Sequence, residues 1–469
     1  MFSGEDELQI LRNLNYFEGI ELTKDYEIAP AFNDFVFNIY DRSYYINGNG
    51  HKIELIGSGG SLVNFNTDYE DNRGKTLTIS KLTVSFVGEI VEHISPAYCY
   101  YALLAMPYYS NLILDHTELT TTGISVTNYG TDELDPNKGN TIVIKNRSVL
   151  KSDYFVIEGG AEFIYIDDST LSAYSTYKFL NDLISNGYSG AVLNIQITNS
   201  TFIGGIELMG GNVNVFNCVL FERFNVGTRT GNILSVNNVN NINVTVVNSV
   251  FSETVTSGTP HYWQCCNSIC ISSSKFENHP SDWGAFIAVG IGGKFEVLNC
   301  LFDHADFSSP TEYATMYLLF VVRFDKVDKI RFVGNNINSQ LHFTARFRID
   351  VYEEVGFENP IVDIDDILIH LNSFSNYINY ESYPNFVLQY SFIEYEDEEY
   401  IIIDTTTIET NKYNHYFFEN TNKSGNSTDR PLFIEAKPCV GYMYYDTTLS
   451  KPIYRSQNDT WVDNNGTTV

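Results

Sequence analysis

The chain of 469 residues carries 28 basic against 58 acidic side chains, which gives a formal net charge of −30. A surface this acidic repels nucleic acid and anionic membranes, so we expect no nucleic-acid partner and no membrane insertion. Aromatic residues make up 14% of the chain, too many for a disordered acidic protein. The composition therefore predicts a folded protein.

The N-terminal segment predicts a short capping helix. Residues 5–16 place Leu11 and Leu14 at near-helical spacing behind an acidic first turn. A Gly-rich corner follows at 45–53, and we expect His51 within it to be a turn residue. This opening resembles that of pectate-lyase-like β-helix proteins, in which a helix plugs the first coil and a Gly-rich corner enters the second.

The chain shows no N-terminal apolar core of the signal-peptide type. It also shows no apolar run of the ~18 residues that a membrane span needs. We therefore expect synthesis in a cytoplasm, export by a route other than a signal peptide, and no separate N-terminal anchoring domain.

One short phrase recurs between residues 168 and 374. It consists of alternating apolar residues, then Asn, a small residue, a free position and a large apolar residue. Its strong copies are Asn199-Ser200-Thr201-Phe202, Asn217-Cys218-Val219-Leu220, Asn248-Ser249-Val250-Phe251 and Asn299-Cys300-Leu301-Phe302; weaker copies begin at Asp168, Ser273, Asn335 and Asn372. The mean spacing of roughly 29 residues is typical of repeats that are each one supersecondary unit.

Each part of the phrase has a physical meaning. Alternation points one set of side chains inward, Asn accepts left-handed backbone angles and turns the chain, and the large apolar residue returns to the interior. So short a unit buries its apolar face only by stacking on its neighbours. Val, Ile, Phe, Asn and Ser in these segments favour strands over helices. The phrase therefore predicts an all-β protein with a right-handed parallel β-helix; a β-propeller, with blades of more regular length, is the alternative.

The phrase also predicts how the chain is divided. The expected segments are an N-terminal cap with the first coils at 1–55, the parallel β-helix at 56–375, a Tyr-rich acidic β region at 376–421, a linker at 422–429 and a small C-terminal β module at 430–469. Uneven spacing between copies implies loops of varying length between otherwise equivalent strands.

The C-terminal module has the most specific pattern in the chain. It reads Arg430-Pro431, then Gly441-Tyr442-Met443-Tyr444-Tyr445-Asp446-Thr447-Thr448-Leu449-Ser450-Lys451-Pro452-Ile453-Tyr454, then Trp461-Val462-Asp463 and Gly466-Thr467. This pattern resembles the terminal module of tail-fibre, tail-spike and head-fibre proteins of phages that infect Bacteroides-type bacteria, including crAss-like phages. Arg455-Ser456-Gln457 departs from the usual Trp-Asn-Gly at the tip of the hairpin.

The resemblance implies a virion protein that is assembled in the host cytoplasm and acts at the bacterial cell surface. It implies other virion proteins as partners and a homotrimeric state. Phage β-helix spikes bind a surface polysaccharide, and some also cleave it. Three functions therefore stay open: adsorption to a surface glycan, depolymerisation of that glycan by a hydrolase or lyase, and a structural decoration fibre without receptor contact.

A hydrolase would need two carboxylates roughly 5–10 Å apart on one face. Glu158 and Glu207 each lie ten residues before a turn of the phrase, which places them at equivalent positions two coils apart. Asp168 lies in the earlier of those coils and completes the candidate catalytic set. The alternative is that Asp168 replaces Asn in the turn and that both glutamates face solvent.

Glycan binding predicts aromatic side chains in loops, because flat rings stack on sugars. The candidates are Trp263, Trp283, Tyr100, Tyr101, Tyr108, Tyr109 and Tyr313. The two Trp are the better candidates, since Tyr has an ordinary packing role on strands.

Other polar groups predict structural roles. Asp115-His116 and Asp303-His304 come without a nucleophile, and adjacent residues of a strand face opposite sides, so each pair is expected to end a strand. The acidic clusters at 363–366 and 394–399 lack the fixed ligand order of a Ca²⁺ loop, which favours a solvated acidic face.

The cysteines predict neither disulfides nor a metal site. Cys218 and Cys300 occupy the same place in two copies of the phrase, so we expect them in an interior stack. Cys265, Cys266 and Cys270 lie close together, but no matching Cys or His pair completes a zinc site. No metal and no cofactor are expected.

Overall fold

The computed structural model describes most of the repeated strands and part of the C-terminal module. The described residues are 11, 18–30, 35–39, 42–57, 61–65, 74–87, 102–106, 110–128, 141–153, 156–158, 163–173, 194–204, 206–208, 212–221, 224–226, 242–252, 261–264, 266–277, 286–289, 294–304, 315–322, 329–339, 342–352, 367–370, 373–375, 386–396, 399–410, 423–425, 427, 443–456 and 460–469.

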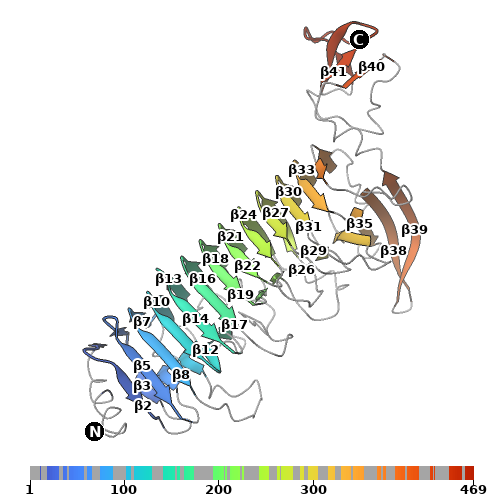
Figure 1. The fold of residues 1–469 in the computed structure, drawn as a ribbon. Coiled ribbons are helices and arrows are strands. Elements are labelled where there is room, and N and C mark those ends of the chain that lie inside the picture. Colours follow the sequence, from blue (N-terminus) through green and yellow to red (C-terminus); the bar gives the residue numbers. More distant parts are fainter. Residues whose placement is uncertain are drawn as a thin grey trace.

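Two long parallel sheets run the length of the solenoid (Figure 1). Sheet A has 13 strands in the order β1 (Gly19–Glu21), β4 (Tyr44–Asn47), β7 (Thr76–Ser80), β10 (Asn111–Asp115), β13 (Thr141–Lys145), β16 (Phe163–Asp167), β18 (Asn194–Thr198), β21 (Asn212–Phe216), β24 (Ile242–Val247), β27 (Cys266–Ser272), β30 (Lys294–Leu298), β33 (Lys329–Val333) and β36 (Ile367–His370). Sheet B has 13 strands in the order β2 (Tyr26–Ile28), β5 (Lys52–Ile56), β8 (Thr83–Val87), β11 (Glu118–Thr121), β14 (Val149–Ser152), β17 (Thr170–Ala173), β19 (Thr201–Ile203), β22 (Val219–Phe221), β25 (Val250–Ser252), β28 (Lys275–Glu277), β31 (Leu301–His304), β34 (Asn336–Ser339) and β37 (Ser373–Ser375).

Shorter sheets form the third face of the coils. One contains β3 (Phe35–Ile39), β6 (Ser61–Phe65), β9 (Ala102–Met106), β12 (Ile124–Asn128) and β15 (Ile157–Glu158). The next contains β20 (Ile206–Leu208), β23 (Phe224–Val226), β26 (His261–Gln264) and β29 (Phe286–Val289). The last contains β32 (Thr315–Val322), β35 (His342–Tyr352), β38 (Phe386–Glu396) and β39 (Glu399–Thr410), of which β38 and β39 pair antiparallel.

The chain passes from sheet A to sheet B, then to the third face, and returns to sheet A one position further along. The strand pairs within sheets A and B are parallel, as in β16 with β18 and β17 with β19. The predicted parallel β-helix is confirmed, and this parallel order excludes the propeller alternative. Of the predicted helix at 5–16 the structure describes Leu11, which is helical and fully buried.

The corner between sheets A and B shows why the phrase contains Asn. Its first residue has positive φ in coil after coil, with values of 50° at Asn199, 55° at Asn217 and 51° at Asn248. Side chains that tolerate left-handed angles are therefore needed at this place. The apolar residue three positions later returns to the interior, and Phe202 and Phe251 are both 0% exposed.

The second corner residue points inward and carries a polar atom that links successive coils. Ser249 Oγ accepts the Cys218 N–H at 3.1 Å and donates to the Val247 carbonyl oxygen at 3.1 Å. The Ser249 N–H in turn donates to Ser274 Oγ of the next coil at 3.2 Å. These side chains satisfy backbone groups that would otherwise be buried without partners.

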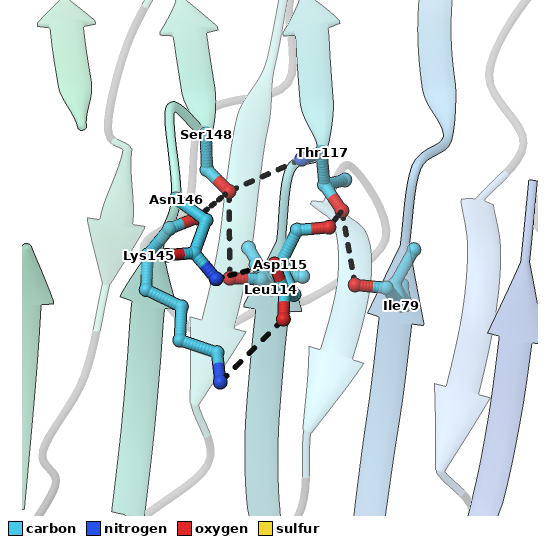
Figure 2. A network of polar contacts seen from close by, with 7 residues as sticks. All are labelled: Ile79, Leu114, Asp115, Thr117, Lys145, Asn146 and Ser148. Carbon is cyan, nitrogen blue, oxygen red and sulfur yellow. Dashed lines mark hydrogen bonds and ion pairs between the residues drawn. The ribbon is translucent and has the colours of Figure 1, made fainter. Parts of the chain in front are cut away.

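Figure 2 shows the same linkage four coils closer to the N-terminus. The Thr117 N–H donates to Ser148 Oγ at 3.1 Å, and Ser148 Oγ donates to the Lys145 carbonyl oxygen at 2.7 Å. Outside the corner, Asp115 accepts a hydrogen bond of 2.8 Å from Asn146 and pairs with Lys145 at 3.5 Å. Polar bonds thus connect the coils both inside and outside this corner.

In two copies of the phrase, the strand pairing differs by one residue from the register that the sequence predicts. Ile337 pairs with Phe302, and Phe374 pairs with Ile337, so in both copies the apolar residue comes two rather than three positions after the Asn. Asn372 lies outside the described residues. Asn335 therefore stands at the second corner position rather than the first. Gly334 supplies the positive φ of 69° in that coil. Asn335 is fully buried; its Oδ1 accepts the Cys300 N–H at 2.9 Å and its Nδ2 donates to the Val297 carbonyl at 3.0 Å. A buried amide therefore replaces the Ser hydroxyl.

Apolar side chains stack along the interior in line with the coils. The rings of Phe251 and Phe276 lie 4.7 Å apart with an interplanar angle of 4°, and those of Phe276 and Phe302 lie 5.0 Å apart at 9°. In-register parallel strands impose this stacking, because equivalent residues of neighbouring coils must meet. Cys218 and Cys300 are each 1% exposed, which confirms the predicted interior positions.

The C-terminal module forms a small separate sheet with its own core. Its strands follow the order β40 (Lys423–Gly425), β41 (Met443–Asp446), β42 (Lys451–Arg455) and β43 (Trp461–Val462). Tyr444, Ile453 and Trp461 form the core, with Val469 packed against it. The predicted linker at 422–429 is wrong for 423–425, because these residues pair in parallel with β41 as β40.

We predict that Ser249→Ala lowers the free energy of unfolding by about 1–3 kcal/mol, because it leaves the buried Cys218 N–H without an acceptor. Amide hydrogen exchange at residue 218 is expected to accelerate. Ser249→Cys is the matched control, since Cys occupies this corner position at 218 and 300, and its loss is expected to be smaller. Unchanged protection of the Cys218 amide in Ser249→Ala would contradict the role given to the hydroxyl.

Candidate functional site

The two glutamates of the candidate catalytic set lie on the third face of the solenoid. Glu158 ends β15, which follows β13 and β14, and Glu207 is in the middle of β20, which follows β18 and β19. The coil of β16 and β17 lies between them, so they are two coils apart, about 10 Å at ~4.8 Å per coil. Their neighbours Ile157 and Ile206 are buried. The side chains of both glutamates lie outside the described part of the structure.

Asp168 lies elsewhere. It is the first residue of the corner between β16 and β17, with φ 44°, the position that Asn199 occupies one coil later. Its carboxylate Oδ2 lies 3.9 Å from Arg147 Nε, and both side chains are exposed, so the pair contributes little to stability. The structure therefore places Asp168 in the role of the turn Asn and does not bring it to the face of Glu158 and Glu207.

The aromatic candidates fall largely outside the described residues. Trp263 is in β26, where its backbone pairs with Val226 on one side and Ala288 on the other, and its side chain is not described. The others that lie outside the described residues are Trp283, Tyr100, Tyr101, Tyr108, Tyr109 and Tyr313. Glycan binding by these rings stays a prediction.

The histidine-containing pairs have structural positions. Asp115 ends β10, and His116 is a corner residue with φ 54°. Asp303, in the last half of β31, pairs with Lys275 across sheet B at 3.3 Å. His51 is in the corner after β4, with Nδ1 3.2 Å from Asp25 Oδ1. The prediction of turn and strand-end roles is confirmed at these positions.

The described cysteines are poor nucleophiles. Burial raises the pKa of the Cys218 thiol to about 11 and that of Cys300 to about 12. Burial and the nearby Glu296 carboxylate also raise the pKa of Cys270. Within the described residues no group of three or more His, Cys, Asp or Glu side chains could hold a metal ion. Among those same residues, no helix has the length and apolarity to cross a membrane.

The C-terminal module holds a buried carboxylate at the centre of its conspicuous motif. Asp446 is 0% exposed and accepts hydrogen bonds from Ser427 Oγ at 2.8 Å and from the Leu449 N–H at 2.9 Å. These bonds tie the segment before the module to the turn of its hairpin. Lys451 donates to Asp463 Oδ2 at 3.0 Å, which joins β42 to the turn after β43. Both carboxylates of the motif therefore hold turns in place.

A row of amide side chains on the outer face of sheet A escaped the sequence analysis. Asn194, Asn212 and Asn243 stand at the start of successive strands and are hydrogen-bonded to one another, each at 2.9 Å. Each lies five residues before the Asn of a corner, a second Asn period that the sequence contains. The corner Asn repeats in the same coils, so the sequence pattern indicated the corner and not this second row.

Comparisons with known proteins add one match. No family model matches the chain, and no curated protein matches its sequence. Tailspike protein 3 of bacteriophage CBA120 is similar to the chain with a TM-score of 0.34 and 12% sequence identity, over 100% of this chain and 67% of that one. A TM-score this low carries no weight for function.

We predict that iodoacetamide near pH 8 leaves Cys218 and Cys300 unmodified in the native protein and modifies both after unfolding. The thiolate is the reactive form, and at pKa values of about 11 and 12 very little of it is present. Mass spectrometry of tryptic peptides measures the modification. Rapid native labelling of either cysteine would contradict the interior stack.

We predict that Lys451→Met makes the C-terminal module unfold at a higher pH during acidification. The Lys451 ammonium and the Thr467 N–H hold the pKa of Asp463 below its usual value. The carboxylate therefore contributes stability above about pH 4, and this contribution is lost as the pH falls through the lowered pKa. Removing Lys451 raises that pKa.

Tryptophan fluorescence followed against pH measures the shift, because Trp461 is in the module core. The control is Lys451→Met placed on an Asp463→Asn background, where no shift is expected. An equal shift on both backgrounds would assign the effect of Lys451 to packing.

Proposed function

We propose that this protein is a fibre or spike component of a bacteriophage virion that adsorbs the particle to a polysaccharide on the bacterial surface. The observation that carries the proposal is the motif of residues 441–463, which resembles the terminal module of phage fibre and spike proteins, on the same chain as a parallel β-helix. The proposed place of action is the bacterial cell surface, after assembly in the host cytoplasm.

The construction of the solenoid supports adsorption. The corner between sheets A and B (the A–B corner) is a short turn in every described coil, so the solenoid is uniform along this corner. Segments of very different length return the chain to sheet A, such as 129–140, 174–193 and 227–241. Length variation at these places changes a binding surface without disturbing the repeating strands, since loops tolerate insertions. The candidate Trp263 is in β26, on the third face of its coil.

The proposed partners are other virion proteins, the glycan and two further copies of this chain. The homotrimer rests on the resemblance to phage β-helix fibres. Light scattering of the purified protein tests it, and a stable monomer at micromolar concentration would contradict it.

Depolymerisation of the glycan is the second candidate function. The equivalent places of Glu158 and Glu207, two coils apart, favour it, because ~10 Å is near the carboxylate separation of inverting glycosidases. In this case one glutamate would protonate the leaving oxygen and the other would activate water. Asp168, in the A–B corner, would then have no direct role.

We predict that the protein is found in purified virions by mass spectrometry. We also expect it to co-elute with host capsular polysaccharide on size exclusion without shortening the polymer. Trp263→Ala and Trp283→Ala are expected to weaken that binding, and Tyr45→Ala, on sheet A, is the control. Absence from virions would contradict the proposal, and virion membership without glycan binding would indicate a structural fibre.

The same incubation tests the second candidate. New reducing ends would indicate a hydrolase, and absorbance near 232 nm would indicate a lyase. For a hydrolase, we expect Glu158→Gln and Glu207→Gln each to reduce product formation by a factor of about 100 or more. Asp168→Asn is the matched control and is expected to retain activity, because Asn is the ordinary residue of that turn. Intact polymer would exclude the depolymerase.

A further inference from the structure

Four consecutive strands of sheet A contain no charged residue. These are β18 (NIQIT), β21 (NVNVF), β24 (INVTVV) and β27 (CNSICIS). The strands on either side are charged on their outer faces. On the N-terminal side β16 ends in Asp167, which accepts a hydrogen bond of 2.9 Å from Asn199, and on the C-terminal side Lys294 pairs with Glu296 of β30 at 2.6 Å. In a chain of net charge −30, this uncharged interval is a distinct surface.

Amide side chains dominate the outer face of this interval. Alternate residues of each strand are buried, as at Ile195 and Ile197, which places Asn194 and Gln196 on the outer face. Asn212 and Asn214 occupy the same two places on the next strand. Asn212 donates one N–H to Asn194 Oδ1 and accepts one from Asn243 Nδ2. Since an amide has two N–H donors and two acceptor sites, Asn212 keeps capacity for a ligand.

An exposed aromatic ring stands at one end of the amide row. Phe163 is 45% exposed and pairs in register with Asn194. Among the described residues, Phe163 is one of four large apolar side chains that are exposed, and it lies beside the amide row. A sugar presents two kinds of surface. The axial C–H groups of the sugar stack on aromatic rings, and the hydroxyls of the sugar form hydrogen bonds with amides, so a ring beside amides can contact both.

The spacing of the row fits a polymer. Successive coils repeat at ~4.8 Å, so five strands from β16 to β27 span about 20 Å along the axis. This repeat is close to the length of one pyranose unit in an extended chain. A polysaccharide lying along the axis would therefore meet two amides on each of β18 and β21 and one amide on β24, at successive coils.

We propose that the amide window, formed by Phe163, Asn194, Gln196, Asn212, Asn214 and Asn243, binds an uncharged polysaccharide that lies along the solenoid axis. The inference rests on the proposed adsorption function and specifies its ligand. Recognition of an acidic polysaccharide needs cationic partners, and the window contains none. The net negative charge of the chain also repels polyanions.

The experiment measures binding of the full chain to two sets of purified bacterial surface polysaccharides. One set has uncharged repeat units and the other contains uronic acid or phosphate. Binding is expected within the uncharged set and should change little when NaCl is raised from about 0.05 to about 0.5 M. Phe163→Ala is expected to weaken the affinity about tenfold. Gln196→Glu with Asn214→Asp is expected to weaken it further, and circular dichroism checks that this variant stays folded, because the two new carboxylates face each other on β18 and β21.

Two control variants match these changes outside the window. Tyr45→Ala removes an aromatic side chain of similar exposure from sheet A, and Asn336→Asp places a charge on an exposed amide of sheet B. Both are expected to bind as the parent protein does.

Three outcomes would overturn the inference. Preference for the acidic set would do so, and so would binding that survives the window variants. If binding is lost only in Trp263→Ala or Trp283→Ala, the adsorption function stands and the window does not. A change of oligomeric state in the window variants, with glycan binding retained, would assign this face to contact between copies. Failure of every polysaccharide to bind would count against the adsorption function itself.

Discussion

The corner between sheets A and B is the constraint on which the solenoid depends. The chain must turn from one sheet to the next within two to four residues and still leave no buried backbone group without a partner. A first residue at positive φ makes the turn, and a second residue with an inward polar atom binds the N–H of the coil before it. Hydroxyl, thiol and amide all serve at the second place, as Ser249, Cys300 and Asn335 show. These corners therefore share an inward polar group at the second place, and the residue type varies.

A rigid corner has consequences for the rest of each coil. Because the register is fixed there, equivalent residues align along the axis, which stacks Phe251, Phe276 and Phe302 inside and the amides of the window outside. Variation in length falls between sheet B and the next strand of sheet A, both before and after the third face. The protein thus presents a uniform row of strands on one side and segments of variable length on another. The amide window is the proposed glycan contact on the first surface, and the candidate loop aromatics are the proposed contact on the second.

Much of this architecture could be predicted because the phrase is local. Asn before a small residue and a large apolar residue encodes a turn whose geometry involves few residues, so the parallel β-helix and the buried Cys218 follow from sequence order. The misplaced register at Asn335 has a physical cause as well. Asn serves either as a left-handed turn residue or as a buried hydrogen-bonding amide, and only the pairing of Ile337 with Phe302 distinguishes the two. Residues 423–425 differ from expectation for another reason: their polar composition indicated a linker, but pairing with the distant β41 makes them β40.

The sequence by itself determined the all-β repeat, the inward residues of each coil and the C-terminal motif, because these depend on patterns within a few residues. Only the tertiary structure decided which distant residues share a face. It separated Asp168 from Glu158 and Glu207, and it assembled the amide window from strands that lie tens of residues apart. The reason is that side-chain neighbours across coils are set by the stacking register, which depends on the length of every intervening turn and loop.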